Sequence, residues 1–167
     1  MISGHAPAGY ITSALLFSKF KERGIRFKQF IWFGISGALL PDIDMFYFHL
    51  IDHRQHHHHS YFTHFPALWG TLLIISIIWL QVSQSSKSAS LSFIFCLCGF
   101  IHLILDSIVG DIWWFAPFVN KSFAMFTVPA LYKPWWLNFI LHWSFALELS
   151  LVIWALLIHR KRSNLLL

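Results

Sequence analysis

The chain has 167 residues, of which 57% are hydrophobic and only 11% are charged, whereas about a quarter of the residues of an average soluble domain are charged. This composition excludes an ordinary soluble domain and predicts one integral-membrane domain over residues 1–167. The net charge of +5 comes from basic residues that gather at 19–28 and 159–162, beside apolar stretches. Such clusters are typical of cytoplasmic membrane anchors, so we expect no nucleic-acid partner.

Apolar segments follow one another along the chain and predict an all-α, polytopic bundle of about four to five helices. Two shorter segments, near residues 6–18 and 29–40, either span the membrane or form a half-inserted hairpin. Three longer segments, at 65–82, 91–109 and 137–158, approach the roughly 20 residues that a spanning helix needs. These three are the predicted membrane spans.

The basic clusters predict how this bundle lies in the membrane. If residues 19–28 are cytoplasmic, successive crossings place residues 41–64 and 110–137 outside. The C-terminal helix and basic tail, 137–167, then return the C-terminus to the cytoplasm. The chain is therefore expected to be a multi-pass protein of the bacterial cytoplasmic membrane, and the Trp-Trp pairs of the connection 110–137 favour the membrane interface.

The same topology brings ionisable residues together at the outer membrane face. Seven side chains are expected there: His5, Asp42, Asp44, His64, His102, Asp106 and His142. Ionisable groups at membrane depth are costly and usually face a partner or a cavity. His102 and Asp106 are four residues apart, so on a helix they share one face and can hold one ion. Carboxylates that follow a helix C-terminus are disfavoured by its macrodipole, and a bound cation would offset this.

The stretch "DHRQHHHHSYFTH", residues 52–64, holds six of the eleven histidines. It is internal, has four consecutive histidines and runs directly into a predicted spanning helix, which argues against a purification tag. A zinc ion takes about four ligands and only a few from one segment. We therefore expect only some of these histidines to be ligands and the others to support them or lie at the surface.

Each of these residues also has a structural interpretation. His142 is equally typical of an interfacial packing residue, and Glu148 of a hydrogen bond between helices. "LPDID" is also a helix stop, and an ion pair between Asp106 and Lys121 is the main alternative to a metal. Because all of the polar residues meet at one face, the metal site is the favoured interpretation.

Four motifs in this order resemble the bacterial LexA-regulated, membrane-bound metal-dependent hydrolases. They are "GHAPAG" with His5, "LLPDIDMF" with Asp42 and Asp44, "HSYFTHF" with His59, Thr63 and His64, and "HLILDSIVGDIWWFAPF" with His102 and Asp106. The resemblance covers residues 1–118. The chain departs from the family pattern at three positions, with Ser60 in place of Arg, Phe65 in place of Ser and Val109 in place of Thr.

The resemblance implies a distant kinship with zinc-dependent phospholipases C and single-strand nucleases, and hydrolysis of a phosphoester of a lipid or lipid-linked molecule by metal-activated water. It implies one or two divalent ions, zinc being the best match to imidazole and carboxylate ligands, held by His5, Asp42, His59, His64, His102 and Asp106. Asp44 would orient or deprotonate the water. Five further residues would hold the ligands in place or act as additional ligands: His53, His58, Thr63, Asp111 and His142. Ala146 stands where those enzymes have a Glu, which argues against a three-metal cluster.

Two other classes of protein remain open from the sequence. A metal-binding or transport membrane protein with a periplasmic His-rich site would explain the histidine run, but it predicts polar ligands across the bilayer, where Glu148 is the chief one. A structural subunit whose histidines cap helices predicts no bound metal.

Overall fold

The computed structural model describes residues 3–83, 86–134 and 136–164. In these ranges the chain forms seven α-helices, five short 3-10 helices and no β-strand, which confirms the all-α prediction. The α-helices are α1 (His5–Leu16), α2 (Phe27–Leu39), α3 (Asp44–Leu50), α4 (Pro66–Val82), α5 (Lys87–Asp106), α6 (Trp136–Ile140) and α7 (Trp143–Asn164). The 3-10 helices are η1 (Phe17–Lys19), η2 (Lys21–Arg23), η3 (Pro41–Ile43), η4 (His58–Ser60) and η5 (Phe62–His64). The expected four to five helices fall short of seven because α3 is too short to show as an apolar segment and because the predicted segment 137–158 divides into α6 and α7.

The helices differ in their capacity to cross a membrane. Only α5 and α7, among the described residues, combine sufficient length with sufficient apolar character, and α4 is shorter at 17 residues. With a rise of 1.5 Å per residue, the 13 residues of α2 extend about 20 Å, less than the roughly 30 Å of a hydrocarbon core. The predicted span 137–158 is not one helix, because α6 ends at Ile140 and α7 begins at Trp143.

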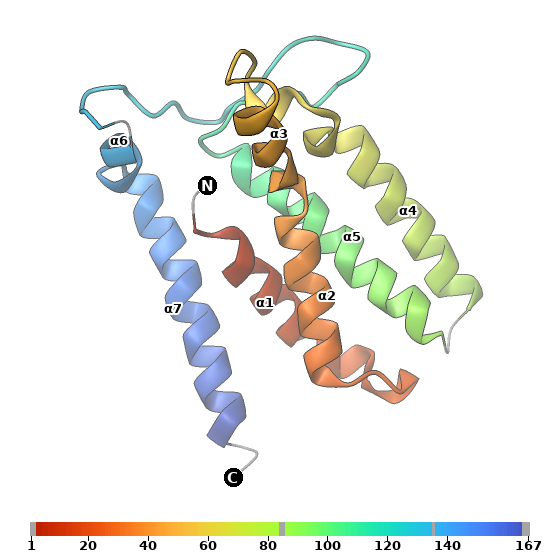
Figure 1. The fold of residues 1–167 in the computed structure, drawn as a ribbon. Helices are drawn as coiled ribbons and strands as arrows, with labels where there is room; N and C mark the ends of the chain where they lie inside the picture. The colour runs from red at the N-terminus through yellow and green to blue at the C-terminus, as the bar shows by residue number, and fades with distance from the viewer. Residues whose placement is uncertain (1–2, 84–85, 135, 165–167) are drawn as a thin grey trace.

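The centre of the bundle is built from α1, α2 and α5, which lie side by side (Figure 1). Gly37 of α2 permits this contact, since a Cβ atom there would lie 2.1 Å from the carbonyl oxygen of Phe95 in α5. Close approach through small residues is the usual packing mode of membrane helices. A cluster of buried side chains that includes Phe30, Ile94 and Cys98 fills the space between these helices.

Helix α7 stands at the side of this centre and packs chiefly against α1 (Figure 1). Most of its apolar surface is exposed, as expected for a helix that faces lipid. Two polar contacts hold it to the N-terminal segment. Glu148 accepts hydrogen bonds from the backbone N–H of Ser3 (2.5 Å) and from its hydroxyl (2.9 Å), and Tyr10 lies 3.2 Å from Nδ1 of His159. Glu148 was predicted to bond to another helix, whereas Ser3, the partner seen here, lies in the segment that precedes α1.

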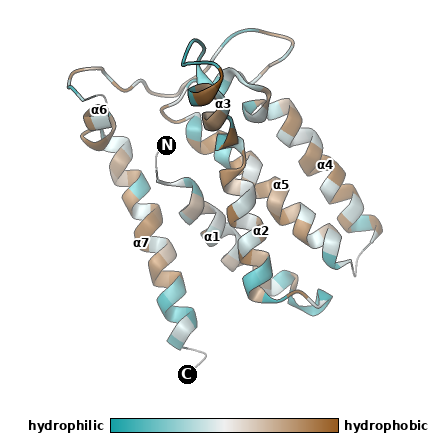
Figure 2. Ribbon diagram, in the orientation of Figure 1, coloured by the Kyte–Doolittle hydropathy of each residue, from teal (hydrophilic) through white to brown (hydrophobic). Residues whose placement is uncertain are grey.

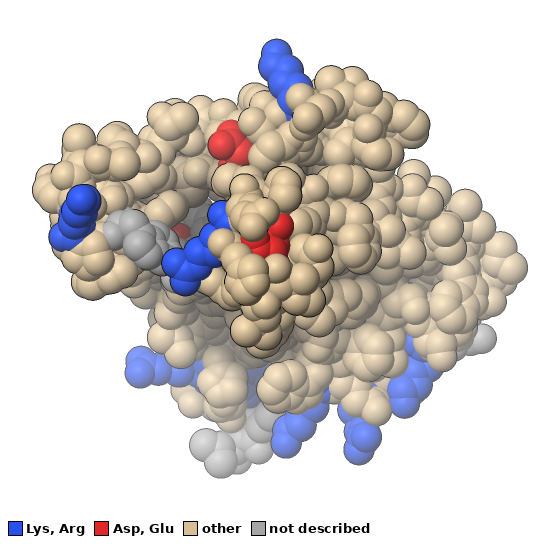
Figure 3. All heavy atoms as spheres, turned by 45° about the horizontal axis from the view of Figure 1, so that its top comes forward, with Lys and Arg blue, Asp and Glu red and all other residues tan. Residues whose placement is uncertain are grey.

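The two ends of the bundle differ in character. One end, which we call the site end, carries α3, η4, η5, the C-terminus of α5 and the connection 107–134 (Figure 1). The other, which we call the basic end, carries residues 19–28, the start of α5 and the end of α7, and hydrophilic residues mark it in Figure 2. Lysines and arginines gather along the lower edge of the molecule in Figure 3. The charge asymmetry expected from the sequence is therefore present in the fold.

Candidate metal centre

Four side chains from three separate segments converge at the site end. We call them the quartet: Asp42 of η3, His64 of η5, and His102 and Asp106 of α5. The Nε2 atoms of His64 and His102 lie 3.3 Å apart, and Oδ1 of Asp42 lies 3.6 Å from each of them. Oδ2 of Asp106 lies 2.9 Å from Nε2 of His102 and 3.8 Å from that of His64. Ligand atoms around a tetrahedral zinc ion, with bonds of about 2.0–2.1 Å, are about 3.3 Å apart, so the quartet has the dimensions of a divalent metal site.

The quartet is buried on all sides but one. The side chains of His64 and His102 are 0% exposed and that of Asp106 is 1% exposed, whereas that of Asp42 is 35% exposed. Two carboxylates and two imidazoles this close together are costly to bury unless positive charge compensates them. Because Asp42 is the one partly exposed member of the quartet, water reaches the quartet beside Asp42.

Hydrogen bonds on the far side of each imidazole ring fix its orientation. Nδ1 of His102 donates to the carbonyl oxygen of Ala38 (2.7 Å), and Nδ1 of His64 donates to Oδ2 of Asp44 (2.5 Å). Because a carbonyl or carboxylate oxygen can only accept, Nδ1 carries the hydrogen in both rings, so that each imidazole in its neutral form turns an Nε2 lone pair toward the centre. Two lone pairs 3.3 Å apart repel each other unless a cation or a proton lies between them.

The electrostatics of His64 indicate the same need for positive charge. Burial acts to lower the pKa of His64, but the nearby carboxylates of Asp42 and Asp44 outweigh burial and raise this pKa to about 9. Burial acts to raise the pKa of Asp42, but the His64 imidazole, 3.6 Å away, outweighs burial, and the pKa of Asp42 lies below its usual value. The surroundings of the quartet thus favour a positive charge at its centre.

Two further predicted ligands contact the carboxylate of Asp106. Nε2 of His59 lies 3.6 Å from Oδ2, the oxygen that faces the quartet, and Nδ1 of His59 donates to the carbonyl oxygen of Asp111 (3.1 Å). Nε2 of His5 lies 3.1 Å from the other oxygen, Oδ1, and the ring of His5 stacks on His102 with centroids 3.7 Å apart. His59 therefore adjoins the quartet directly, whereas His5 lies behind it.

Asp44 lies on the opposite side of His64 from the quartet. Its Oδ2 atom accepts hydrogen bonds from Thr63 Oγ1 (2.5 Å) and from Nδ1 of His64, and its side chain is buried. This location differs from the water-orienting position expected from the sequence, and it favours a role in which Asp44 and Thr63 hold the His64 ring. Residues of this kind raise the basicity of a ligating imidazole.

Replacement of Asp44 by asparagine is expected to weaken metal binding by about 10–100-fold without unfolding the protein, because an amide holds and polarises His64 less well than a carboxylate. The affinity is measured by competition with a chromophoric chelator, and helix content by circular dichroism. Asp111→Asn is the matched control, since only the main-chain oxygen of Asp111 contacts a histidine. An Asp44→Asn affinity within twofold of wild type contradicts this role for Asp44.

The rest of the histidine run supplies no ligand atom to the quartet, although the ring of His58 packs edge-on against that of His64 with centroids 5.8 Å apart. Nδ1 of His56 lies 2.7 Å from the carboxylate of Asp52, and the backbone N–H of His56 donates to the same carboxylate. These two hydrogen bonds lower the pKa of Asp52 to about 2. His53 is exposed with a φ of 48°. His58 is half-buried against His59, with ring centroids 3.9 Å apart, and burial lowers its pKa to about 4. The run therefore brings His59 and His64 inward, while His58 packs behind His59.

Three other sequence predictions have a different outcome. His142 was expected in the first turns of a spanning helix, but it lies in the turn between α6 and α7, where its Nδ1 atom is 2.9 Å from the Ser144 hydroxyl. Asp111 contributes its main-chain oxygen and not its exposed side chain. Lys121 is exposed, and no ion pair joins it to Asp106 within the described ranges. The lysine alternative to a metal is therefore not what the structure shows.

The comparisons with known proteins identify one family. The model of the family described as "YdjM inner membrane protein" matches residues 1–165. No curated protein and no solved structure matches the chain.

Proposed function

This chain belongs to the YdjM inner membrane protein family, and we propose that it is a membrane-bound metal-dependent hydrolase that cleaves a phosphoester of a lipid or lipid-linked molecule. The observation that carries the metal part of this proposal is the pair of Nε2 atoms 3.3 Å apart, each with its Nδ1 atom engaged elsewhere, between two carboxylates. The basic end supports a multi-pass topology with a cytoplasmic C-terminus and with the quartet facing the periplasm.

Asp42, His64, His102 and Asp106 would hold one divalent ion, and this donor set of two imidazoles and two carboxylates suits zinc. His59 would serve a second ion or hold Oδ2 of Asp106, and His5 would serve a second ion or hold the other oxygen of Asp106. When bound, the ion supplies a coordinated water with a pKa of about 7 and offsets negative charge on the phosphoryl oxygens.

The exposed edge of the quartet determines where substrate would enter. Catalytic zinc sites keep one position open for water, usually beside three protein ligands. Asp42 is the exposed member of the quartet, with 35% of its side chain accessible. We assign it the open side, where it would accept a hydrogen bond from the attacking water, while the buried His64, His102 and Asp106 keep the rest of the centre dry.

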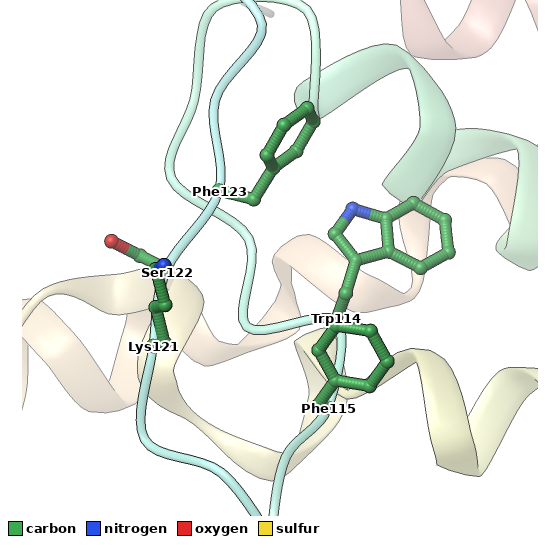
Figure 4. Close-up of a pocket in the computed structure, with 5 residues that line it drawn as sticks. All are labelled: Trp114, Phe115, Lys121, Ser122 and Phe123. Atoms are coloured by element: carbon green, nitrogen blue, oxygen red, sulfur yellow. The ribbon is translucent and has the colours of Figure 1, made fainter.

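The lipid part of the proposal is supported by a pocket in the connection 107–134. This pocket of about 400 Å³ is lined by Trp114, Phe115 and Phe123, with Lys121 and Ser122 beside them (Figure 4). The same connection supplies the carbonyl oxygen of Asp111 that holds His59. Apolar walls with one cation suit an amphiphile that has an apolar chain and an anionic headgroup.

The purified protein, reconstituted with zinc, is expected to release a phosphorylated headgroup or phosphate from at least one member of a lipid and lipid-linked substrate panel. Asp42→Ala is expected to lower this rate by at least about 100-fold, since it removes the carboxylate at the open side. Asp52→Ala is the control. Asp52 lies at the same end of the molecule, but its carboxylate bonds to His56 and not to a residue of the quartet.

The products are measured by mass spectrometry and the fold by circular dichroism. A wild-type protein that binds zinc but releases nothing from the panel, and that moves zinc across a vesicle membrane, would overturn the hydrolase in favour of the transporter. Equal rates for Asp42→Ala and wild type would show that the quartet is not the reactive centre.

A further inference from the structure

A second hollow lies at the basic end, far along the bundle from the quartet. It has a volume of about 570 Å³ and is lined by residues of α2 and its N-cap and by Arg162 of α7: Arg26, Phe27, Lys28, Gln29, Trp32, Phe33 and Arg162. We propose that this hollow binds an anionic glycerophospholipid of the leaflet at the basic end. The inference does not rest on the proposed hydrolase activity, because it concerns other residues.

The rim of the hollow carries three cations with no acidic partner. Among the described residues, no ion pair engages Arg26, Lys28 or Arg162. Nine of the twelve lysines and arginines belong to the segments of the basic end, and Glu22 is the only acidic residue there. No acidic side chain among the described residues therefore neutralises the positive charge of the rim, which is complementary to a phosphate group.

The position of Arg162 is fixed by aromatic contacts. Its guanidinium carbon lies 3.4 Å from the ring centroid of Phe27 and 5.3 Å from that of Phe17. A guanidinium that stacks on aromatic rings keeps its N–H groups free to bind a phosphate oxygen. Arg162 is thus positioned before a ligand arrives, which lowers the entropy cost of binding.

The wall of the hollow is aromatic and lies farther along α2 than the rim. Trp32 follows Lys28 by four residues, and Phe33 follows Gln29 by four, so each pair shares one face of the helix. The side chain of Trp32 is 65% exposed and that of Phe33 is 43% exposed. With a rise of 1.5 Å per residue, the aromatic wall begins about 6 Å from the cationic rim. This arrangement fits a single lipid molecule. Its phosphate would lie on the cations of the rim, and its acyl chain would lie along Trp32, deeper in the membrane.

The hollow also lies where the protein itself packs loosely. Helix α7 packs chiefly against α1, and the stacking of Arg162 on Phe27 is a direct contact between α7 and α2. A lipid seated between Arg162 and the start of α2 would add contacts between these two helices. Anionic lipid bound there would therefore hold α7 against the bundle.

The test uses the whole protein in phosphatidylcholine nanodiscs with increasing fractions of phosphatidylglycerol brominated on its acyl chains. Trp32 fluorescence, obtained as the difference between wild type and Trp32→Phe, is expected to be quenched at a low fraction of this lipid. Lys28→Gln is expected to raise the half-quenching fraction about fivefold, since one cation near an anionic lipid contributes about 1 kcal/mol. The side chain of Lys28 has no hydrogen bond or ion pair within the described ranges, so this change leaves the fold intact, and Arg162→Gln provides a second variant.

Lys161→Gln is the matched control, because it removes one positive charge from the basic end, in the same turn of α7 as Arg162, but Lys161 does not line the hollow. A shift as large in Lys161→Gln as in Lys28→Gln would show diffuse attraction to the whole basic end and would overturn the site. Equal quenching by brominated phosphatidylcholine would show that the headgroup is not recognised. Reversal of the quenching by millimolar glycerol phosphate would identify a site for a soluble phosphate and would overturn the lipid.

Discussion

Replacement of His64 by alanine is expected to abolish metal binding, whereas replacement of His56 or His57 is expected to leave it intact. His64 is fully buried, and its Nε2 atom faces both His102 and Asp42 at the centre of the quartet. His56 is 68% exposed and bonds to Asp52. Loss of residues that merely support a ligand costs about 10–100-fold in metal affinity, so loss of this ligand is expected to exceed 100-fold.

Metal content of the purified proteins, measured by inductively coupled plasma mass spectrometry, provides the comparison. The wild type, prepared without chelator, is expected to hold stoichiometric metal, which would remove the purely structural alternative. Equal loss of metal in the His56 and His64 variants would show that the wrong histidines of the run have been chosen. A metal-free wild type would exclude the metal centre itself, and with it the proposed hydrolase.

Local spacing predicted part of the quartet correctly. His102 and Asp106 are four residues apart in an apolar segment, and in α5 they share a face with Nε2 and Oδ2 2.9 Å apart. Asp42 and Asp44 show the limit of such reasoning. Both follow a short helix, but η3 and the start of α3 send Asp42 to the centre and Asp44 to the far side of His64. The spacing of two residues allows several arrangements, and only the turn geometry selects one.

The orientation of the histidine rings could not be read from the sequence. Ala38 and Asp111 hold His102 and His59 through main-chain carbonyl oxygens, and every residue type has such an oxygen. These contacts depend on which turn of one segment faces which turn of another. The sequence therefore indicated the ligand types, while tertiary packing determines which nitrogen faces the centre.

The break between α6 and α7 could not be predicted from hydropathy, because it also depends on contacts between different segments. Residues 137–158 form one continuous apolar stretch, but Asn138 binds the backbone of the preceding connection, accepting from the N–H groups of Leu131 and Tyr132 at 2.8 and 2.7 Å. These bonds hold α6 to the connection, and the chain turns at His142 before α7 begins. The side chain of His142 also accepts a hydrogen bond from the backbone N–H of Ser144 at the start of α7 (3.4 Å), so polar contacts on both sides accompany the break.

Asp106→Asn is expected to lose metal and also to lower the melting temperature by about 10 °C. The carboxylate of Asp106 is 1% exposed and contacts His5 of α1, His59 of η4 and His102 of α5, so it joins three elements. Removing one partner of a buried charged cluster costs about 3–5 kcal/mol, and each kcal/mol corresponds to roughly 2–4 °C in a domain of this size. Asp111→Asn serves as the control and is expected to melt with the wild type, since its side chain is exposed.

Chelation separates the contribution of the ion from that of the carboxylate. An ion bound only to the folded protein stabilises it, so a strong chelator is expected to lower the melting temperature of the wild type. The same chelator should have little effect on Asp106→Asn, because the two changes remove one shared interaction and are not additive. If the chelator lowers both melting temperatures equally, the ion is bound elsewhere, and Asp106 stabilises the fold without it.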